Sequence, residues 1–429
     1  MEDAWDFSLG TDVKILCVPK NLEVGGSQIN ALQMAVALAQ RGHEVIIASS
    51  PGPLTSQLGD EGVLVTEIPP AESRWGRLAA LSRLKREHEP EVIHAYEVCT
   101  IMDCCFTSQF EPHTPVLGTI MSTRVPWYLP ESVPITVGVP NVAEFTGRWR
   151  SGRVVLIEPP IPEPPLLRPG DPTRQDAGDP ESRIVLVSRL VEPFKREGIL
   201  GMISAMRVLG RSGFRLDIVG DGPARPLFEQ AAEFVSGEVG TSVISFRGAT
   251  LDPQAAIEFA DVVVGSGVSV IQGVMLGKPA VVIGRAGYSA VVSRESLTGL
   301  IDRGFYGVGN GQPMEDVLPA QILSSINTAR KAELTMIADE IRARYGISAI
   351  AERFEAELRL VRVEPPPNPW EMSRSLARAA HYRARRGFFR LQAQRLGLKA
   401  EVGDNFVYGR LRNLALPPST FATGRNRPS

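Results

Sequence analysis

The chain has 429 residues, a formal net charge of −2 and 43% hydrophobic residues. This length exceeds a single ordinary core, so we expect two domains of roughly 150 to 200 residues each. The first residues, MEDAWDFSLG, lack the basic and apolar regions of a secretory signal, and no apolar run approaches the ~18 residues that would span a membrane. We therefore expect a cytoplasmic protein.

Charge distribution and cysteine content narrow the chemistry further. The segment from Glu371 to the end of the chain holds twelve Lys and Arg against three acidic residues, a net +9, which leaves −11 for the rest. The four cysteines form no CxxC pair and have no histidine at a zinc-ligand spacing, so we expect reduced thiols and no structural zinc. The rest of the chain is acidic and shows no recognition module, so we expect no nucleic-acid partner.

Predicted strands and helices alternate from the start of the chain. The patterns predict a buried strand over 13–18 (VKILCV), a helix over 25–40 that two glycines open, and a second strand after Gly42 (HEVIIAS). The strand LVTEIP, the helix LAALSRLKREHEP and the strand EVIHAYE continue the alternation. This order predicts a parallel sheet with helices on both faces.

A proline-rich stretch separates this half from a second one of the same kind. Residues 158–180 hold too many prolines for a helix or a central strand, and five further apolar runs alternate with helical patterns after it. We predict an α/β protein with two Rossmann-like domains, 1–158 and 183–335, joined by a linker at 159–182 and facing each other across a cleft. Ligands of such sheets bind beyond the carboxyl ends of the strands.

Two predicted loops carry residues suited to binding an anion. Gly25 and Gly26 would let the backbone approach a phosphate or a sugar, although a tight turn before a helix explains them equally well. Arg189 and Lys195 in SRLVEPFKREG lie between a strand and a helix, where a guanidinium and an ammonium can clamp a diphosphate. The chain has neither a GxGxxG fingerprint nor a P-loop, which disfavours nicotinamide chemistry and nucleoside triphosphate hydrolysis.

Other candidates lie at further predicted strand ends. Gly220 and Asp221 in VGDGP fit a turn, and we expect Asp221 to form the turn or cap a helix rather than to act in catalysis. His94 in VIHAYE is expected at a strand end that faces the cleft, where its ring can bind a substrate hydroxyl or phosphate. His43 is expected on the opposite side of the sheet, in a structural role.

The stretch GSGVSVIQGVMLGKP, residues 265–279, predicts a buried helix whose N-terminus faces a ligand. Ser266 and Gly267 would leave backbone N–H groups free for a phosphate. Gln272 is the one strong polar side chain that follows, and a neutral amide is unexpected beside an anion site.

In this order, the motifs resemble those of retaining, nucleotide-sugar-dependent glycosyltransferases of GT-B fold, in the glycogen-synthase-like and capsular-sugar group (glycosyltransferase family 4-like). The likeness covers roughly 13–361 and includes a glycine loop with its helix (GGSQINALQMAVALAQRGHEV), a cleft histidine (VIHAY), a diphosphate clamp (SRLVEPFK), a central turn (IVGDGP) and a donor-binding helix (ADVVVGSGVSVIQGVMLGKPAVV). The resemblance implies a transferase that moves a sugar from a nucleotide-diphosphate sugar to an acceptor hydroxyl or amine with retention. It names neither the sugar nor the acceptor.

The resemblance also implies roles for single residues. His94 would lie near the transferred sugar at the catalytic centre. Arg189, Lys195 and the N–H groups at 266–269 would bind the donor diphosphate, and residues 246–248 would border the donor base. The full set of residues that would bind the donor is Gly25, Gly26, Arg189, Lys195, Gly220, Asp221, Arg247, Ser266, Gly267, Val268, Ser269 and Gln272. No metal is implied because no DxD-like acidic pair stands at a suitable strand end, and a donor phosphate would help to deprotonate the acceptor.

The chain departs from the family pattern at the donor-binding helix. Gln272 stands where the family has a glutamate, Val264 lies eight residues earlier in place of a second one, and Val268 stands where a polar residue is usual. Because glutamine offers one acceptor, we hypothesise that Gln272 contacts the donor ribose and favours a deoxythymidine-type donor over a uridine-type one. Local packing of Gln272 without a ligand is the alternative. Two other functions stay open: a non-catalytic GT-B-like binding or partner subunit, and a coupling enzyme that uses a nucleotide-activated cyclitol.

The end of the chain is predicted to be helical. Residues 336–361 would return to the first domain as two amphipathic helices that break at Gly346, and 362–429 form a basic extension with interleaved apolar residues. This extension can contact an anionic membrane surface, an acidic acceptor or a protein partner. It can also wrap the acidic body of the chain, which is the interpretation we favour.

Overall fold

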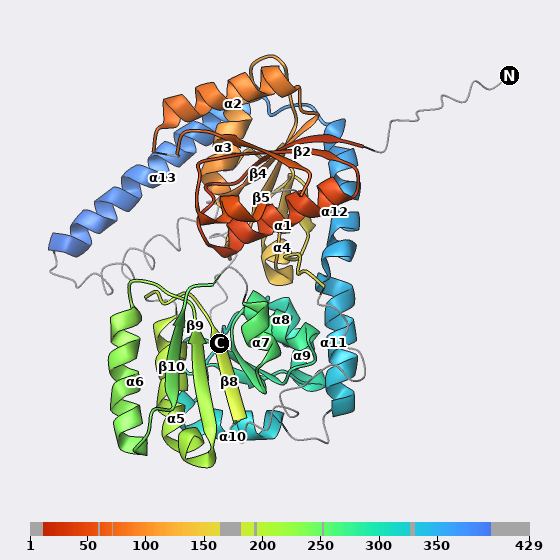
Figure 1. Cartoon of the computed structure of the whole chain (residues 1–429). Coiled ribbons are helices and arrows are strands. Elements are labelled where there is room, and N and C mark those ends of the chain that lie inside the picture. Colours follow the sequence, from red (N-terminus) through yellow and green to blue (C-terminus); the bar gives the residue numbers. More distant parts are fainter. Residues whose placement is uncertain are drawn as a thin grey trace, which may run out of the picture. The chain divides into compact units, whose positions relative to one another are not determined.

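The computed structural model describes residues 12–58, 61–70, 72–163, 182–192, 195–250, 253–326 and 331–395. These residues form two compact units (Figure 1). Unit 1 runs up to Pro160 and resumes at Ile350, and unit 2 runs from Ile161 to Ala349. Most of the predicted linker and the last part of the predicted basic extension lie outside the described residues.

Unit 1 is built on a parallel sheet in the order β3-β2-β1-β4-β5-β6-β7. Its central strands β4 and β5 are buried throughout, as expected for strands covered on both faces. The strands are β1 (Lys14–Val18), β2 (Glu44–Ser49), β3 (Val63–Glu67), β4 (Val92–Tyr96), β5 (Val116–Ile120), β6 (Ile135–Val137) and β7 (Val154–Leu156).

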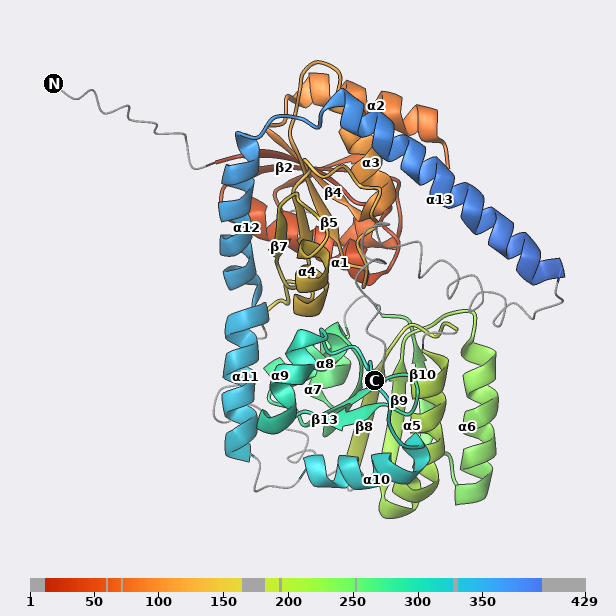
Figure 2. The ribbon, with the colours of Figure 1, turned by 180° about the vertical axis from the view of Figure 1, so that it is seen from behind.

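The helices of unit 1 come from both ends of the chain. They are α1 (Gly26–Gln40), α2 (Arg74–His88), α3 (Glu97–Thr107), α4 (Pro140–Gly147), α12 (Ile347–Arg362) and α13 (Pro369–Arg395), with a short 3₁₀ turn η1 (Pro53–Leu58). In α12, Ile350, Phe354 and Leu358 recur every four residues and are buried in one core with α1 and the sheet. Helix α13 runs alongside α2 and α3 (Figure 2) and buries Met372 and Ala379, so this part of the basic extension packs on unit 1.

Unit 2 contains a second sheet in the order β10-β9-β8-β11-β12-β13. Its strands are β8 (Ser182–Val187), β9 (Phe214–Val219), β10 (Ile244–Gly248), β11 (Val262–Gly265), β12 (Ala280–Ile283) and β13 (Ser289–Val291). The pairings are parallel except that of β12 with β13, a short edge strand that the sequence patterns did not predict. Ile184 and Leu186 face one core and Val185 faces the other, because side chains alternate along a strand.

Helices cover both faces of this second sheet. One core contains residues of α5 (Arg196–Leu209), α6 (Arg225–Val239) and α10 (Met314–Ser325), and the other contains residues of α7 (Gln254–Glu258), α8 (Val268–Met275), α9 (Arg294–Asp302) and α11 (Lys331–Tyr345). The 3₁₀ turn η3 (Gly210–Ser212) follows α5. The predicted α/β class with two parallel-stranded sheets is therefore confirmed. None of the helices within the described ranges is both long and apolar enough to cross a membrane.

Each sheet has one point at which the chain reverses its winding direction. In unit 1 this switch point lies between β1 and β4, and in unit 2 it lies between β8 and β11. The loops that leave two such strands diverge, which opens a crevice at the carboxyl edge of the sheet. The two switch points are thus where the fold alone places candidate sites.

Candidate functional site

A cluster of two cations and a hydroxyl lies at the switch point of unit 2. Lys195 precedes the first residue of α5, and its Nζ donates a hydrogen bond of 2.6 Å to the Oγ of Ser266, which follows β11. Arg189 follows β8 and is exposed. Burial and the nearby charge of Arg189 lower the pKa of Lys195. Neither cation forms an ion pair with a carboxylate in the described part of the chain, so an anionic ligand would offset their repulsion.

The first turn of α8 adds backbone donors to this cluster. Gly267 precedes the helix with a φ of 69°, a left-handed conformation that favours glycine, and donates its own N–H to the carbonyl of Phe305. The N–H groups of Val268 and Ser269 have no backbone acceptor among the described residues. Both side chains are half-buried. Free N–H groups at a helix N-terminus beside Lys195 and Ser266 suit a phosphate.

Gly220 and Asp221 shape the neighbouring loop. Gly220 has a φ of 132°, and a Cβ there would lie 2.0 Å from the carbonyl oxygen of Ser188, so only glycine allows these two loops to approach. Asp221 is exposed and accepts hydrogen bonds from the N–H of Gly222 (2.7 Å) and from Arg225 (3.0 Å), which lower its pKa. These contacts are those of a residue that forms a turn.

Arg247 and Gln272 differ in whether their side chains already have partners among the described residues. The guanidinium of Arg247 contacts Oδ1 of the buried Asp217 at 3.0 Å from Nε and 2.8 Å from Nη2. Asp217 also lies 3.4 Å from Nη1 of Arg183, so this one carboxylate offsets the charge of Arg247 only in part. The amide of Gln272 is half-buried, lies one turn beyond Ser269 and makes no side-chain hydrogen bond with the residues that the structure describes.

The glycine loop lies at the switch point of unit 1. Gly25 is the buried N-cap of α1 in extended backbone, and its carbonyl accepts the N–H of Ile29. Gly26 is exposed, and no atom lies within 4 Å of a Cβ built on it. No close contact within the described chain thus requires glycine at position 26.

The predicted strand-end position of His94 is wrong. His94 is the third residue of β4 and is 1% exposed, on the same face as Tyr96 and beneath α12. Its ring centroid lies 4.4 Å from that of Tyr96 and 4.5 Å from that of Phe354, and Nε2 lies 2.7 Å from the Oγ1 of Thr119. Burial lowers the pKa of His94 to about 3, so the ring is neutral. His94 is therefore enclosed within unit 1 and does not lie at the end of its strand.

The residue that directly follows the end of β4 is Glu97, the first residue of α3, which the sequence patterns did not single out. It connects β4 to α3 with a φ of 65°, a strained value for a residue with a side chain. Its Oε1 accepts the N–H of Met121, and Ser27 and Lys20 lie close enough to act on the carboxylate. Burial raises the pKa of Glu97 and outweighs these three contacts. Its position directly after an apolar run, in VIHAYE, is the feature of the sequence that could have identified Glu97 as a site residue.

Comparisons with known proteins identify the fold. No protein-family model and no curated protein matches the chain. A glycosyltransferase from Rickettsia africae ESF-5 aligns with a TM-score of 0.65 and 16% identity over 82% of this chain and 98% of its own. Sucrose-phosphate synthase from Thermosynechococcus elongatus aligns with a TM-score of 0.62 and 17% identity over 81% and 99%. HepE from Anabaena, in complex with UDP and glucose, aligns with a TM-score of 0.61 and 16% identity over 81% and 100%. The chain thus has the two-domain GT-B fold of these glycosyltransferases.

Proposed function

We propose that the protein transfers a sugar from a nucleotide-diphosphate sugar to an acceptor hydroxyl or amine. The observation that carries this proposal is the convergence of Arg189, Lys195 and Ser266 at the β8/β11 switch point, with the free N–H groups of α8 beside them. HepE, which was crystallised with UDP and with UDP-glucose, provides a precedent for the ligand class in this fold.

These residues would act mainly on the leaving group. When the bond between the sugar and the diphosphate breaks, negative charge develops on the phosphate oxygens. The guanidinium of Arg189 can make a forked contact to such oxygens, and the ammonium of Lys195 is fixed by its hydrogen bond to Ser266. Because these groups are in place before the reaction, they stabilise the charge without reorganising.

We further propose transfer with retention of the anomeric configuration, without a metal ion and in the cytoplasm. The motif order of the chain supports retention, with a donor phosphate oxygen as the base for the acceptor. The two cations supply positive charge that a metal ion provides in other diphosphate sites. The acceptor would lie at the switch point of unit 1, where Glu97 can orient a hydroxyl or amine.

A thermal-shift screen with UDP, dTDP, GDP and ADP tests the proposal. One diphosphate should raise the melting temperature of the full chain, because a ligand that binds only the folded state stabilises it. The matching glucose-linked donor should then release the diphosphate in the presence of a hydroxyl or amine acceptor, with EDTA having no effect. NMR of the product would give its anomeric configuration. Stabilisation by none of the four diphosphates would contradict donor binding, and binding without release would favour a non-catalytic subunit.

A further inference from the structure

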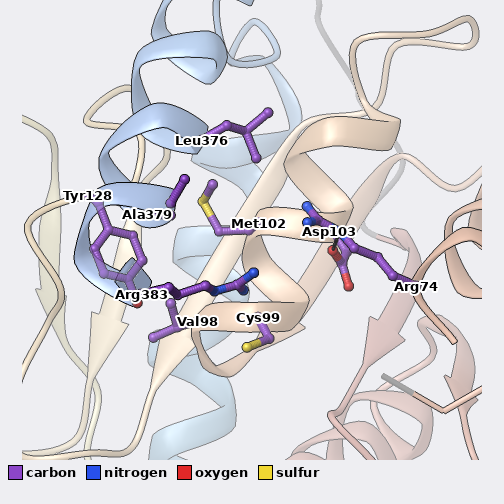
Figure 3. Close-up of a pocket in the computed structure, with 10 residues that line it drawn as sticks. Arg74, Val98, Cys99, Met102, Asp103, Tyr128, Leu376, Ala379 and Arg383 are labelled. Carbon is purple, nitrogen blue, oxygen red and sulfur yellow. Dashed lines mark ion pairs between the residues drawn. The ribbon is translucent and has the colours of Figure 1, made fainter. Parts of the chain in front are cut away.

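Unit 1 contains a cavity of about 300 Å³ between α3, α13 and the loop that holds Tyr128 (Figure 3). From α3 come Cys99, Met102 and Asp103, and from α13 come Leu376 and Arg383, among other residues. The spacings place each set on one side of its helix. The volume is at the lower end of the range for small-molecule sites.

Positive charge exceeds negative charge around this cavity. Its carboxylate, Asp103, is buried and lies 3.5 Å from Arg74 Nε and 3.9 Å from Arg77 Nε. Burial raises the pKa of Asp103, and the charges of Arg74, Arg77 and Arg383 oppose that rise. One carboxylate faces three guanidinium groups, so the cluster keeps an excess of positive charge.

Arg383 is the guanidinium in this cluster that a ligand can use. Arg77 already donates to the carbonyls of Pro19 (3.1 Å) and Pro69 (3.3 Å), and Arg74 is paired with Asp103. Arg383 lines the cavity and makes no hydrogen bond or ion pair with any residue in the described ranges. Its charge acts on Asp103 from a distance, but an exposed arginine that lines a cavity without a direct ion pair can still bind a carboxylate or phosphate.

The rest of the lining offers a hydrogen-bond donor and an apolar wall. Burial raises the pKa of Tyr128 to about 12, so its hydroxyl stays protonated, and it forms no hydrogen bond within the part of the chain that the structure describes. Met102 and Leu376 face the cavity from opposite helices (Figure 3). The lining therefore combines a free cation and a free hydroxyl with aliphatic surface.

We propose that this cavity binds a small acid with an apolar body, its carboxylate or phosphate held by Arg383 and Tyr128 and its apolar part by Met102 and Leu376. The cavity lies along α3, which starts directly after β4 at the switch point of unit 1. This position assigns the acid as the acceptor of sugar transfer, an assignment that rests on the proposed function. Because α13 forms one wall, acceptor choice depends on the C-terminal extension.

Cys99 reports on occupancy of the cavity without any sugar transfer. It is exposed and lines the cavity, whereas Cys17, Cys104 and Cys105 are buried. Burial raises the pKa of Cys17 to about 12 and raises the pKa of Cys104 and Cys105 as well, so these three thiols stay protonated and unreactive. A neutral thiol reagent such as 4,4′-dithiodipyridine should modify one thiol per native chain, and Cys99→Ser should remove that reaction.

The test is the rate of this modification in the full chain with mandelate, phenyl phosphate or 1-phenylethane-1,2-diol. The diol replaces the carboxylate of mandelate with a neutral group of similar size. Mandelate or phenyl phosphate should slow the reaction at least about fivefold in a saturable manner, while the diol slows it less than about twofold, because only the acids pair with Arg383. The more protective of the two acids distinguishes a carboxylate site from a phosphate site. Equal protection by the diol, or none by either acid, would overturn the proposal.

Two arginine variants localise the effect. Arg383→Gln should weaken the protective affinity about tenfold or more. Arg385→Gln should change it less than about twofold, because Arg385 is equally exposed on α13 but does not line the cavity. Equal effects of both variants would place the anion elsewhere.

The acceptor assignment has its own readout. Diphosphate release from the donor should be stimulated by hydroxy acids more than by their neutral alcohol analogues. Stimulation by the alcohols alone, or by neither class, would refute the acceptor role. Protection of Cys99 without diphosphate binding would refute the proposed function and leave the cavity proposal intact. Diphosphate binding without protection of Cys99 would refute the cavity proposal and leave the proposed function intact.

Discussion

The two sheets have equivalent switch points but carry opposite chemistry there. At the edge of unit 2, Lys195 and Arg189 lie without a carboxylate partner in the described residues. At the edge of unit 1, the residue that follows β4 is Glu97. Its carboxyl group accepts a hydrogen bond from the N–H of Met121, and its backbone is strained. The first arrangement suits a diphosphate, and the second suits a hydroxyl or amine that gives up a proton.

In this fold the strand order sets where a crevice opens, and the loop residues set the charge of that crevice. In both units the strand order opens a crevice at one position. The charge of the first residues beyond the strands then selects an anion or a proton donor. The two edges can be perturbed separately from each other and from the core of unit 1, so each prediction below alters one of these three regions and uses another as its control.

The largest expected effect is on the cationic edge. Lys195→Met should weaken binding of the preferred nucleoside diphosphate by about 2 to 3 kcal/mol, or ~30- to 150-fold, because a buried charge-assisted contact is lost. The melting temperature of the free protein should not fall, since burial already lowers the pKa of Lys195 and so disfavours the charged form. Calorimetry measures the affinity, and Lys14→Met, in a partly exposed ion pair with Glu44, is the control. A fall in melting temperature with unchanged affinity would make Lys195 structural.

The next largest expected effect is on the stability of unit 1, through Glu355 of α12. Glu355 accepts from Arg41 (2.5 and 3.0 Å) and lies 3.1 Å from the Nε2 of His43, whose Nδ1 accepts the N–H of Val13. Glu355→Ala should therefore destabilise unit 1 by about 2 kcal/mol, because His43 loses its partner in the core. Diphosphate affinity should change less than about twofold. A large loss of affinity would show that diphosphate binding in unit 2 depends on the stability of unit 1.

The pH dependence of this loss follows from the pKa of Glu355. The hydrogen bond from Arg41 is the main cause that lowers this pKa in the folded state. A lowered carboxyl pKa stabilises the fold above the unfolded pKa, and that contribution disappears as pH falls through the folded pKa. The stability difference between the wild-type protein and Glu355→Gln, measured by urea unfolding, should thus shrink below about pH 4.

A smaller effect sharpens the donor side of the comparison. Gln272→Glu should increase the preference for UDP over dUDP by about tenfold, because a carboxylate accepts from both ribose hydroxyls where the amide accepts once. The wild-type protein should bind dTDP at least as tightly as UDP. Paired calorimetric titrations measure both ratios. Tenfold tighter binding of UDP by the wild-type protein, or an unchanged UDP/dUDP ratio in the variant, would remove Gln272 from the ribose site.

The cationic edge was easier to predict from sequence than the acidic one. Arg189 and Ser266 each follow a clear apolar run, and Lys195 directly precedes a clear helical pattern, so the parallel-sheet rule brings all three to one edge. The predicted position of His94 was wrong because VIHAY is buried along its whole length, and a strand buried on both faces has no alternating pattern that shows where it ends. The φ of Glu97 is a property of the folded backbone that no local pattern encodes.

The cavity beside α13 also escaped sequence reasoning. The pattern of the basic extension predicted a helix with an apolar side, and Met372 and Ala379 are indeed buried. It did not predict which surface that side covers, because the partner helix α3 lies more than 250 positions earlier in the chain. Long-range packing of this kind depends on the shape of both surfaces, which a single amphipathic pattern does not contain.

The smallest expected effect concerns the acidic edge and has opposite signs in stability and in activity. Burial raises the folded-state pKa of Glu97, so the folded protein binds more protons than the unfolded chain between the two pKa values, and wild-type stability falls as pH rises through this window. Glu97→Gln keeps the oxygen that accepts from Met121 and removes the charge. The variant should be ~0.5 to 1 kcal/mol more stable than the wild-type protein at about pH 8 and no more stable below about pH 4.

The transfer rate of Glu97→Gln should fall while its diphosphate affinity is unchanged. Glu23→Gln, at an exposed position of the glycine loop, should alter neither. If Glu97→Gln is instead less stable than the wild-type protein at high pH, the charged carboxylate stabilises the fold. The acidic edge would then not reduce the stability of unit 1.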